Sequence, residues 1–121
     1  MINSKYIIYK YQGQYGPGID GVFTNKYLAD HIRKYYLCGS FNKRVPTYVH
    51  KTNLKFVKGL LRGYFDGDGN INAIKRNISC STRSKELMED ISFLLKYFGI
   101  YSSYTKYYQQ ADGRKNPLYQ L

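Results

Sequence analysis

The fold of this chain is indicated most clearly by one segment, Leu60-Leu61-Arg62-Gly63-Tyr64-Phe65-Asp66-Gly67-Asp68-Gly69. It completes an apolar pattern with the i, i+3, i+4, i+7, i+8 spacing of one helix face: Val57, Leu60, Leu61, Tyr64 and Phe65. Two carboxylates follow directly, at Asp66 and Asp68. Because two glycines accompany them, the sequence predicts that the helix is broken between residues 66 and 69 and gives way to a turn.

The acidic turn is a candidate metal site. Asp66 and Asp68 flank Gly67, so they need not point the same way, and an outward Asp is a hard oxygen ligand suited to Mg²⁺. Such a metal activates water and stabilises charge on a scissile phosphate. The alternative is an Asp-Gly turn that only ends a core helix. A helix–loop–helix calcium site is disfavoured, because the twelfth position counted from Asp66 is Asn77 where that loop carries Glu.

Two glycines inside the predicted helix, Gly59 and Gly63, are four residues apart and share a face. Each costs about 1 kcal/mol relative to Ala in a helix interior. Two of them indicate a packing reason, because small residues let another backbone approach closely. We therefore expect the Gly59/Gly63 face to be buried against another helix.

Composition narrows the class of partner. The 121 residues fit one domain, with a formal net charge of +11 and a pI near 9.6. That charge fits DNA, RNA or an anionic membrane. The membrane is set aside, since there is no apolar span of about 18 residues and no helix with a basic face. The 15 Tyr could serve base stacking, or reflect a coding bias toward A and T. Cys38 and Cys80 lack metal-ligand spacing, which favours buried thiols in a reducing intracellular compartment, the cytoplasm or an organelle matrix.

The expected elements include both strands and helices. Strands are expected at 5–11, 70–74, 77–82, 101–109 and 118–121, with possible resumption of the first sheet at Val22-Phe23. Helices are expected from a Thr24 cap to Leu37, from Thr52 or Asn53 through the quoted stretch, and from a Ser84 cap over 85–98. Loops or turns are expected at 12–21 and 111–117, where Gly, Pro and polar residues gather.

The flanking residues carry a family resemblance. Leu61 to Gly69 resembles the signature of the LAGLIDADG homing endonucleases, in the form of intein-borne and organellar members. Lys43-Arg44-Val45-Pro46 is similar to the family's Lys-x-Ile-Pro lead-in. Two further segments resemble the start and end of its next helix: Thr82-Arg83-Ser84-Lys85-Glu86-Leu87 and Leu94-Leu95-Lys96-Tyr97-Phe98-Gly99-Ile100. The resemblance covers about Lys43 to Leu121.

The resemblance implies an α+β fold, an αββαββα unit in which two signature helices pack together beneath an antiparallel sheet shaped as a saddle over the DNA major groove. It implies that Asp68 is the catalytic metal ligand, assisted by the Gly67 carbonyl, with Mg²⁺ or Mn²⁺ as the cofactor. Asp66 and Gly69 would shape the turn. The facing helix would come from a homodimer or a second chain.

The strands after the signature would contact nucleic acid. Alternation places Ile78 and Cys80 on one face of the strand, and Asn77, Ser79 and Ser81 on the other. A similar row is expected on the later strand. Polar side chains of these kinds suit base edges and phosphates, although an ordinary solvated face remains the alternative. The full expected set is Asn70, Asn72, Lys75, Arg76, Asn77, Ser79, Ser81, Arg83, Tyr104, Lys106 and Tyr108.

The domain is expected to span 1–121. Residues 1–42 resemble the second half of a preceding repeat, and 43–121 hold the one signature. Lys26, Leu28 and Ile32 match Lys85, Leu87 and Ile91 at a 59-residue spacing, which is weak evidence for a repeat. The chain thus resembles a segment of a two-repeat enzyme that holds one signature and lacks the other. The expected function is a site-specific, metal-dependent DNA endonuclease, or a fragment or subunit of one. The alternative is a catalytically inactive nucleic-acid-binding module of this fold, maturase-like on RNA or ribosome-associated.

Overall fold

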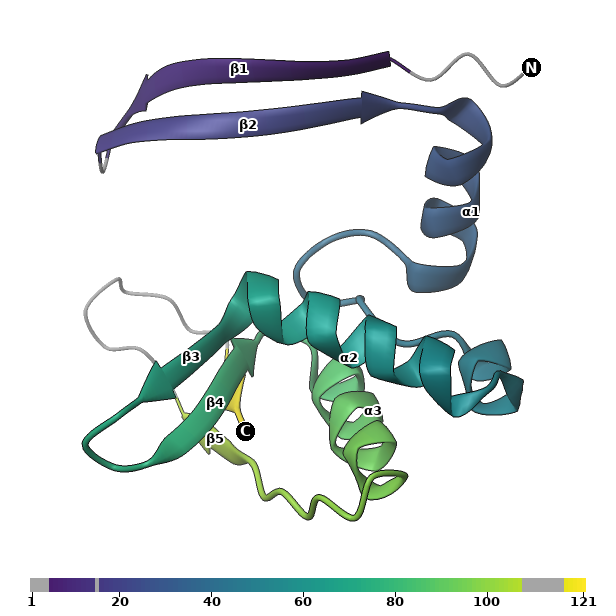
Figure 1. Cartoon of the computed structure of the whole chain (residues 1–121), viewed down its shortest axis with the longest axis vertical. Coiled ribbons are helices and arrows are strands. Elements are labelled where there is room, and N and C mark those ends of the chain that lie inside the picture. The colour runs from purple at the N-terminus through teal and green to yellow at the C-terminus, as the bar shows by residue number, and fades with distance from the viewer. Residues whose placement is uncertain (1–4, 15, 108–116) are drawn as a thin grey trace. The chain divides into compact units, whose positions relative to one another are not determined.

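The chain folds into two compact units, which we describe separately. The computed structural model describes residues 5–14, 16–107 and 117–121. One unit is Met1–Lys34 and the other is Tyr35–Leu121, so the division falls within helix α1 (Lys26–Tyr36). Figure 1 labels the elements in chain order.

The first unit begins with an antiparallel hairpin of β1 (Lys5–Gly13) and β2 (Gly16–Thr24). The expected loop over 12–21 is wrong from Gly16 onward, because Gly18 and Gly21 are strand residues. The ring of Tyr11 lies across Gly18, where a Cβ would overlap it, and a Cβ on Gly21 would lie 3.0 Å from the Tyr6 hydroxyl. The glycines therefore mark close approach of rings to backbone and not a turn.

Helix α1 begins one residue later than expected. Its N-cap is Asn25 and not Thr24, because the Leu28 amide donates to the Asn25 Oδ1 at 3.0 Å. Helix α3 (Lys85–Lys96) begins at the expected cap, with the Leu87 amide donating to the Ser84 Oγ at 3.1 Å. Asn25 and Ser84 keep the 59-residue spacing of the sequence match, and each helix follows a strand of a hairpin.

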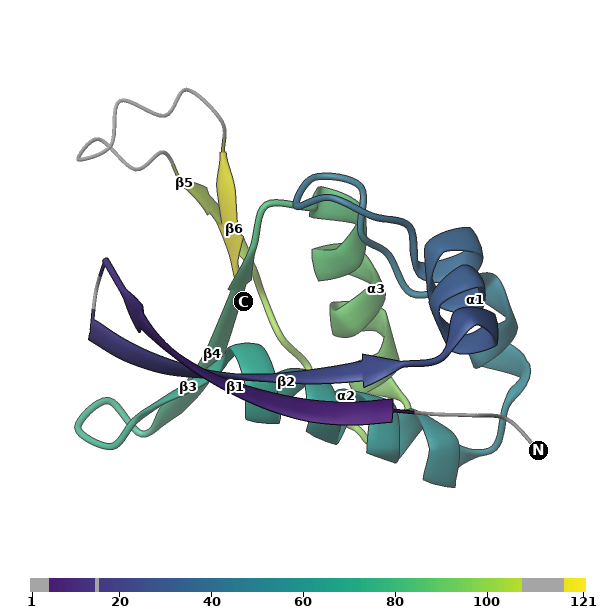
Figure 2. The same ribbon diagram turned by 90° about the horizontal axis from the view of Figure 1, so that it is seen from above.

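The second unit packs helices against a four-stranded sheet. Its elements are η1 (Thr47–Lys51), α2 (Leu54–Asp68), β3 (Gly69–Asn72), β4 (Asn77–Thr82), α3, β5 (Thr105–Tyr107) and β6 (Leu118–Gln120). The sheet is antiparallel in the order β3-β4-β6-β5. Helix α3 lies against one face of this sheet (Figure 2). The α+β class is confirmed.

The core of this unit lies where the predicted apolar faces meet. Val57 and Leu61 of α2 are buried against Ile91 and Leu94 of α3. Val45 and Val49, which precede α2, complete this cluster. A second cluster joins helix to sheet through Met88, Cys80 and Tyr119. The predicted α2 face is confirmed, since its other members, Leu60, Tyr64 and Phe65, pack against the core while partly exposed.

The acidic residues do not break α2. The helix continues through Asp68, and the Gly69 amide donates to the Phe65 carbonyl at its end. The expected break at residues 66–69 is therefore wrong. Glycine tolerates helical backbone angles at a cost of about 1 kcal/mol, and the packed helix ahead of Gly67 sustains one more turn. As a result, Asp68 occupies the final helical turn rather than a loop.

Several later boundaries are shorter than expected. β3 ends at Asn72, whose Oδ1 accepts from the Lys75 amide at 2.9 Å and so starts the turn before β4. α3 ends at Lys96, two residues before Phe98, and Gly99 follows with φ +71°, a left-handed angle that suits glycine. β5 covers only Thr105–Tyr107 of the expected 101–109. The expected turn at 111–117 lies outside the described residues except for Pro117.

Candidate active site

Asp68 lies at one end of a groove that runs along the glycine side of α2. The groove has a volume of about 430 Å³. We call it the glycine groove, and its lining includes Gly59, Gly63, Asp68, Arg44, Leu87 and Ile91. Asp68 itself is exposed. The exposed carboxylate and the two small residues therefore share one surface of the second unit.

The glycine groove is open in this chain. No atom of the described residues outside the immediate neighbourhood lies within 4 Å of a Cβ placed on either Gly59 or Gly63. Both residues are exposed, so α3, the other α-helix within the second unit, does not cover them. The expectation that this face is buried stays a prediction, and it requires a helix from another molecule or another segment.

The two carboxylates of the signature lie in different surroundings. Asp66 lines a separate, larger hollow of about 920 Å³ together with Ile71 and Ile78. Its Oδ2 lies 3.5 Å from the Nε of Arg62, one helical turn earlier, and both side chains are largely exposed. Such an exposed helical pair contributes about 0.3–0.5 kcal/mol. Asp68 instead lines the glycine groove, which separates the two acids as their spacing around Gly67 suggested.

The residues at the end of α2 fit part of a magnesium shell. Mg²⁺ binds one or two carboxylates and completes its shell with waters and substrate phosphate. Asp68 offers one carboxylate, and a carbonyl in the last turn, such as that of Gly67, has no amide donor within the helix. The negative end of the helix dipole also favours a cation there. The described residues contain no group of three or more His, Cys, Asp or Glu able to hold a metal, so the remaining ligands must come from elsewhere.

Sequence reasoning did not single out the buried hydroxyl of Tyr64, one turn before Asp68. The Tyr64 hydroxyl lies near the Cys80 thiol, yet it has no partner at hydrogen-bonding geometry among the described residues. Burial raises the pKa of Tyr64, and Cys80 and Asp68 add to the rise. Burial likewise raises the pKa of the Cys80 thiol. Both groups are therefore neutral beneath Asp68 at neutral pH.

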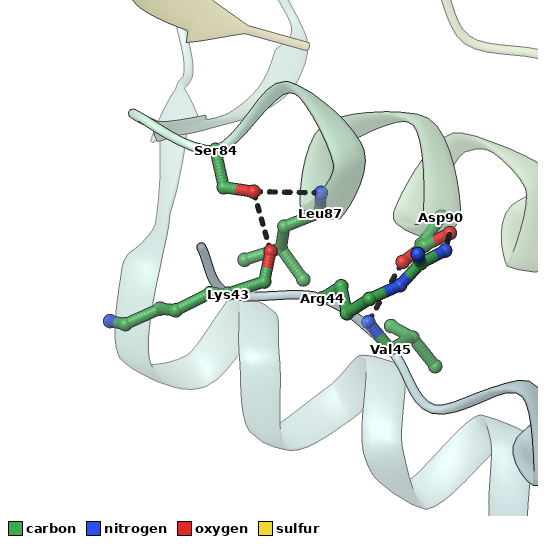
Figure 3. Close-up of polar contacts among 6 residues, drawn as sticks. All are labelled: Lys43, Arg44, Val45, Ser84, Leu87 and Asp90. Atoms are coloured by element: carbon green, nitrogen blue, oxygen red, sulfur yellow. Dashed lines mark hydrogen bonds and ion pairs between the residues drawn. The ribbon is translucent and has the colours of Figure 1, made fainter. Parts of the chain in front are cut away.

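The wall of the glycine groove is held by a polar clamp between the connector before η1 and helix α3 (Figure 3). The Ser84 hydroxyl donates to the Lys43 carbonyl while it accepts from the Leu87 amide. The Val45 amide donates to the Asp90 Oδ2 at 2.8 Å. Arg44 lies 3.5 Å from the other Asp90 oxygen. The contacts of Lys43, Arg44 and Val45 with α3 and its cap join residues more than forty positions apart, so no local sequence signal identifies Asp90 as a partner of the connector.

We expect Ser84→Ala to destabilise the second unit by about 2–3 kcal/mol. The side chain of Ser84 is fully buried, so alanine removes the α3 cap and leaves the Lys43 carbonyl without its donor. Urea unfolding followed by circular dichroism measures the change. The matched control is Asn53→Ala, which removes an exposed cap of α2 and should cost about 1 kcal/mol. Equal losses for the two variants would contradict a role of Ser84 beyond capping.

Most of the expected nucleic-acid-binding residues of β3 and β4 lie on one face of the sheet. Cys80 is buried against α3, so the residues that alternate with it point away from the helices. Asn70 pairs with Ser79 and Asn72 with Asn77 in the register of the hairpin. We call this surface the amide face; its β3 and β4 members are Asn70, Asn72, Asn77, Ser79 and Ser81.

The expected cations lie outside the amide face. Lys75 and Arg76 occupy the turn between β3 and β4, and Arg76 has a left-handed φ of +51°. The Arg76 side chain lines the larger hollow beside Ile78. Arg83 follows β4 and is partly exposed. Of the named residues, the structure thus gathers the amides and hydroxyls on one face and distributes the charges around it.

The expected row on the later strand lies on the helix side of the sheet. Lys106 pairs with Tyr119, whose side chain is buried with Cys80 and Met88. The Tyr104 hydroxyl donates to Glu89 of α3 at 3.0 Å, and its ring packs on Tyr119. Thr105 is therefore the β5 residue that lies on the same side of the sheet as the amide face. The predicted row on this strand is displaced from that face by one residue. Tyr108 lies outside the described residues.

The fold and the site together define the class of domain. A packed acidic helix followed by antiparallel strands matches the model of the LAGLIDADG-like domain over residues 55–121, and the chain belongs to the LAGLIDADG family. This confirms the family resemblance of the signature. Membership indicates a homing-endonuclease-type or related nucleic-acid-binding function, and members of the family generally bind DNA and dimerise.

Similar segments occur in larger proteins of very different names. The chain is 48% identical over 67 residues to the DNA-directed RNA polymerase subunit Rpo1C of Methanocaldococcus jannaschii, covering 55% of this chain and 8% of that protein. It is 36% identical over 97 residues to the glutamine–fructose-6-phosphate aminotransferase of the same organism, covering 77% and 9%. It is 42% identical over 59 residues to a probable translation initiation factor IF-2 of Thermococcus kodakarensis, covering 49% and 5%. The chain thus spans less than a tenth of each of these relatives.

None of the helices that the structure describes combines the length and the apolar character needed to cross a bilayer.

Proposed function

We propose that this domain is part of a site-specific, metal-dependent DNA endonuclease. The observation that carries the proposal is the position of Asp68, exposed in the final turn of α2 at the end of the glycine groove. A carboxylate at a helix C-terminus, beside a surface that admits a second helix, is half of a paired metal site. The partner helix, from a second copy or another chain, would supply the other half.

The metal ion in this proposal is Mg²⁺ or Mn²⁺. Asp68 and the Gly67 carbonyl would hold it from this chain, with phosphate oxygens of the DNA and a carboxylate of the facing helix completing the shell. When bound, such an ion supplies activation of water and charge stabilisation at the scissile phosphate. Among the described residues that line the glycine groove with Lys43 and Arg44, Asp68 is the acidic one that would face the ion, while the nearby Tyr64 hydroxyl and Cys80 thiol are neutral.

The substrate of the proposed enzyme is double-stranded DNA. The net charge of +11 supplies affinity for phosphates, and the amide face supplies groups that suit base edges. The major groove of B-DNA admits a two-stranded β ribbon. The major groove of A-form RNA is too deep and narrow for side chains to read. The experiment must therefore distinguish the proposed DNA endonuclease from the alternative, a catalytically inactive module that binds RNA.

The setting we propose is an element carried inside an unrelated host protein or gene. The matched relatives have names with no common function, and the shared segment is 8%, 9% and 5% of their lengths. A segment recurring at that scale in unrelated proteins is what an intein or intron-associated element would leave. This supports a mobile-element nuclease over a domain of one metabolic enzyme.

The test uses the purified chain with supercoiled plasmid carrying its native flanking locus. We expect nicking or cleavage with Mg²⁺, none with EDTA, and binding that weakens steeply as salt rises, because phosphate contacts release counterions. Binding of the duplex without metal-dependent nicking would establish the inactive alternative. Equal or better binding to RNA hairpins would overturn duplex DNA as the substrate.

A further inference from the structure

The amide face carries an unusual set of groups for a basic protein. Its members on β3 and β4 are all neutral carboxamides or hydroxyls, and Gln120 of β6 continues it through its pairing with Ser81. No charged side chain belongs to this face among the described residues of β3, β4 and β6. The surface therefore offers hydrogen-bond selectivity without charge, while the surrounding cations supply attraction.

The chemistry of the face favours adenine. A carboxamide pairs bidentately with the N6 and N7 atoms of adenine in the major groove, whereas guanine is read mainly by Arg or Lys. Arg76, the nearest arginine in the hairpin, lines the larger hollow on the helix side of the sheet. The Arg76 guanidinium, which would select guanine, is thus directed away from the amide face.

Not every carboxamide is available for bidentate contact. The Asn72 Oδ1 already accepts from the Lys75 amide at 2.9 Å, which holds this side chain against the turn and leaves its oxygen one lone pair for other partners. Asn70 and Asn77 are exposed. Their side chains make no recorded hydrogen bond to another described residue, so each retains both a donor and an acceptor.

The register of the hairpin sets the spacing of these two side chains. Asn70 is opposite Ser79, and Asn77 is opposite Asn72, so Asn70 and Asn77 are diagonal neighbours. Two residues along a strand span about 6.8 Å. Successive base pairs in B-DNA rise about 3.4 Å. A hairpin lying along the groove therefore presents these carboxamides two base pairs apart.

We propose that Asn70 and Asn77 are specificity-determining residues that read two adenines separated by one base pair in the major groove of the target. This rests on the proposed function, since it requires double-stranded DNA as the substrate, and it specifies which part of the target the β3–β4 hairpin selects. Asn72 positions the turn and contributes no adenine preference of its own.

The test is selection from duplexes with a randomised core, in buffer without divalent metal, using the full chain and its Asn70→Ala and Asn77→Ala variants. The parent should enrich two A·T pairs separated by one base pair. Each variant should lose the adenine preference at a different one of these positions by about 5- to 100-fold, the discrimination of one bidentate pair. Both residues are exposed, and circular dichroism verifies that the variants fold.

The control is Lys75→Ala, which removes a charge in the turn and leaves the amide face intact. It should weaken binding to all duplexes alike and reduce the salt dependence without changing the enriched sequence. An enriched site that lacks the two adenines, or that the asparagine variants leave unchanged, would overturn this inference while the proposed function stands. Failure of the parent chain to bind any duplex would overturn both.

Discussion

Asp68→Asn is expected to abolish metal-dependent cleavage while DNA binding is retained. Asparagine has nearly the same size, but it carries no charge with which to hold a divalent cation. We expect the cleavage rate to fall at least about 100-fold, since a catalytic metal is worth several kcal/mol of charge stabilisation. Binding in buffer without metal should be unchanged or slightly tighter, because a negative charge near the phosphates is removed.

The stability of the Asp68→Asn variant provides an independent reading. A negative charge at a helix C-terminus opposes the helix dipole, so its removal should raise stability by about 0.3–1 kcal/mol. Loss of cleavage would then not be explained by unfolding. Cleavage rates and urea denaturation measure the two effects on the same preparation.

Asp66→Asn is the matched control for this variant. It is the same substitution two residues earlier, but Asp66 faces the larger hollow and pairs only weakly with Arg62. We expect cleavage within about threefold of the parent, because the loss of an exposed ion pair has an energy below 1 kcal/mol. Equal cleavage by Asp68→Asn and the parent would refute the metal assignment, and an equal loss in both variants would show that the two acids act together.

The double variant Gly59→Ala/Gly63→Ala is expected to stabilise the isolated fold and prevent its assembly. Beyond the neighbouring backbone of α2, neither Cβ meets an atom of the described residues within 4 Å, and alanine is favoured over glycine by about 1 kcal/mol in a helix. The free energy of unfolding, measured with urea, should therefore rise by about 1–2 kcal/mol. The two methyl groups fill the surface that a second helix needs for close approach, so assembly and cleavage should be lost together.

In that variant, sedimentation velocity measures the loss of assembly separately from the change in stability that urea unfolding gives. Its control is Lys58→Ala, an exposed position of α2 that does not line the glycine groove. The control should keep both the parent's assembly state and its cleavage. A double variant that assembles and cleaves like the parent would exclude the glycine groove as a helix interface. A loss of stability would instead show that the glycines are required within the chain itself.

Local patterns predicted much of the second unit. The apolar spacing of Val57, Leu61 and their neighbours predicted the buried face of α2, Ser84 is the expected cap of α3, and Asn53 is one of the two expected starts of α2. These features depend on residues three or four positions apart, which the helix brings together wherever it lies. The same local reasoning was wrong about the glycines, because Gly67 and Gly18 are accommodated by packing that their neighbours along the chain do not reveal.

Residues close together along the chain predicted the buried face of the acidic helix, its family and the polar character of the strands. The side of the sheet on which each strand residue lies, and the contacts that hold the groove beside Asp68, were found only in the folded structure. Lys106 is turned toward the helices by its pairing with Tyr119, and the connector is held by Asp90, forty-five residues from Val45. Strand phase and long-range hydrogen bonds depend on partners far along the chain, and a shift of one residue reverses the face that a side chain occupies.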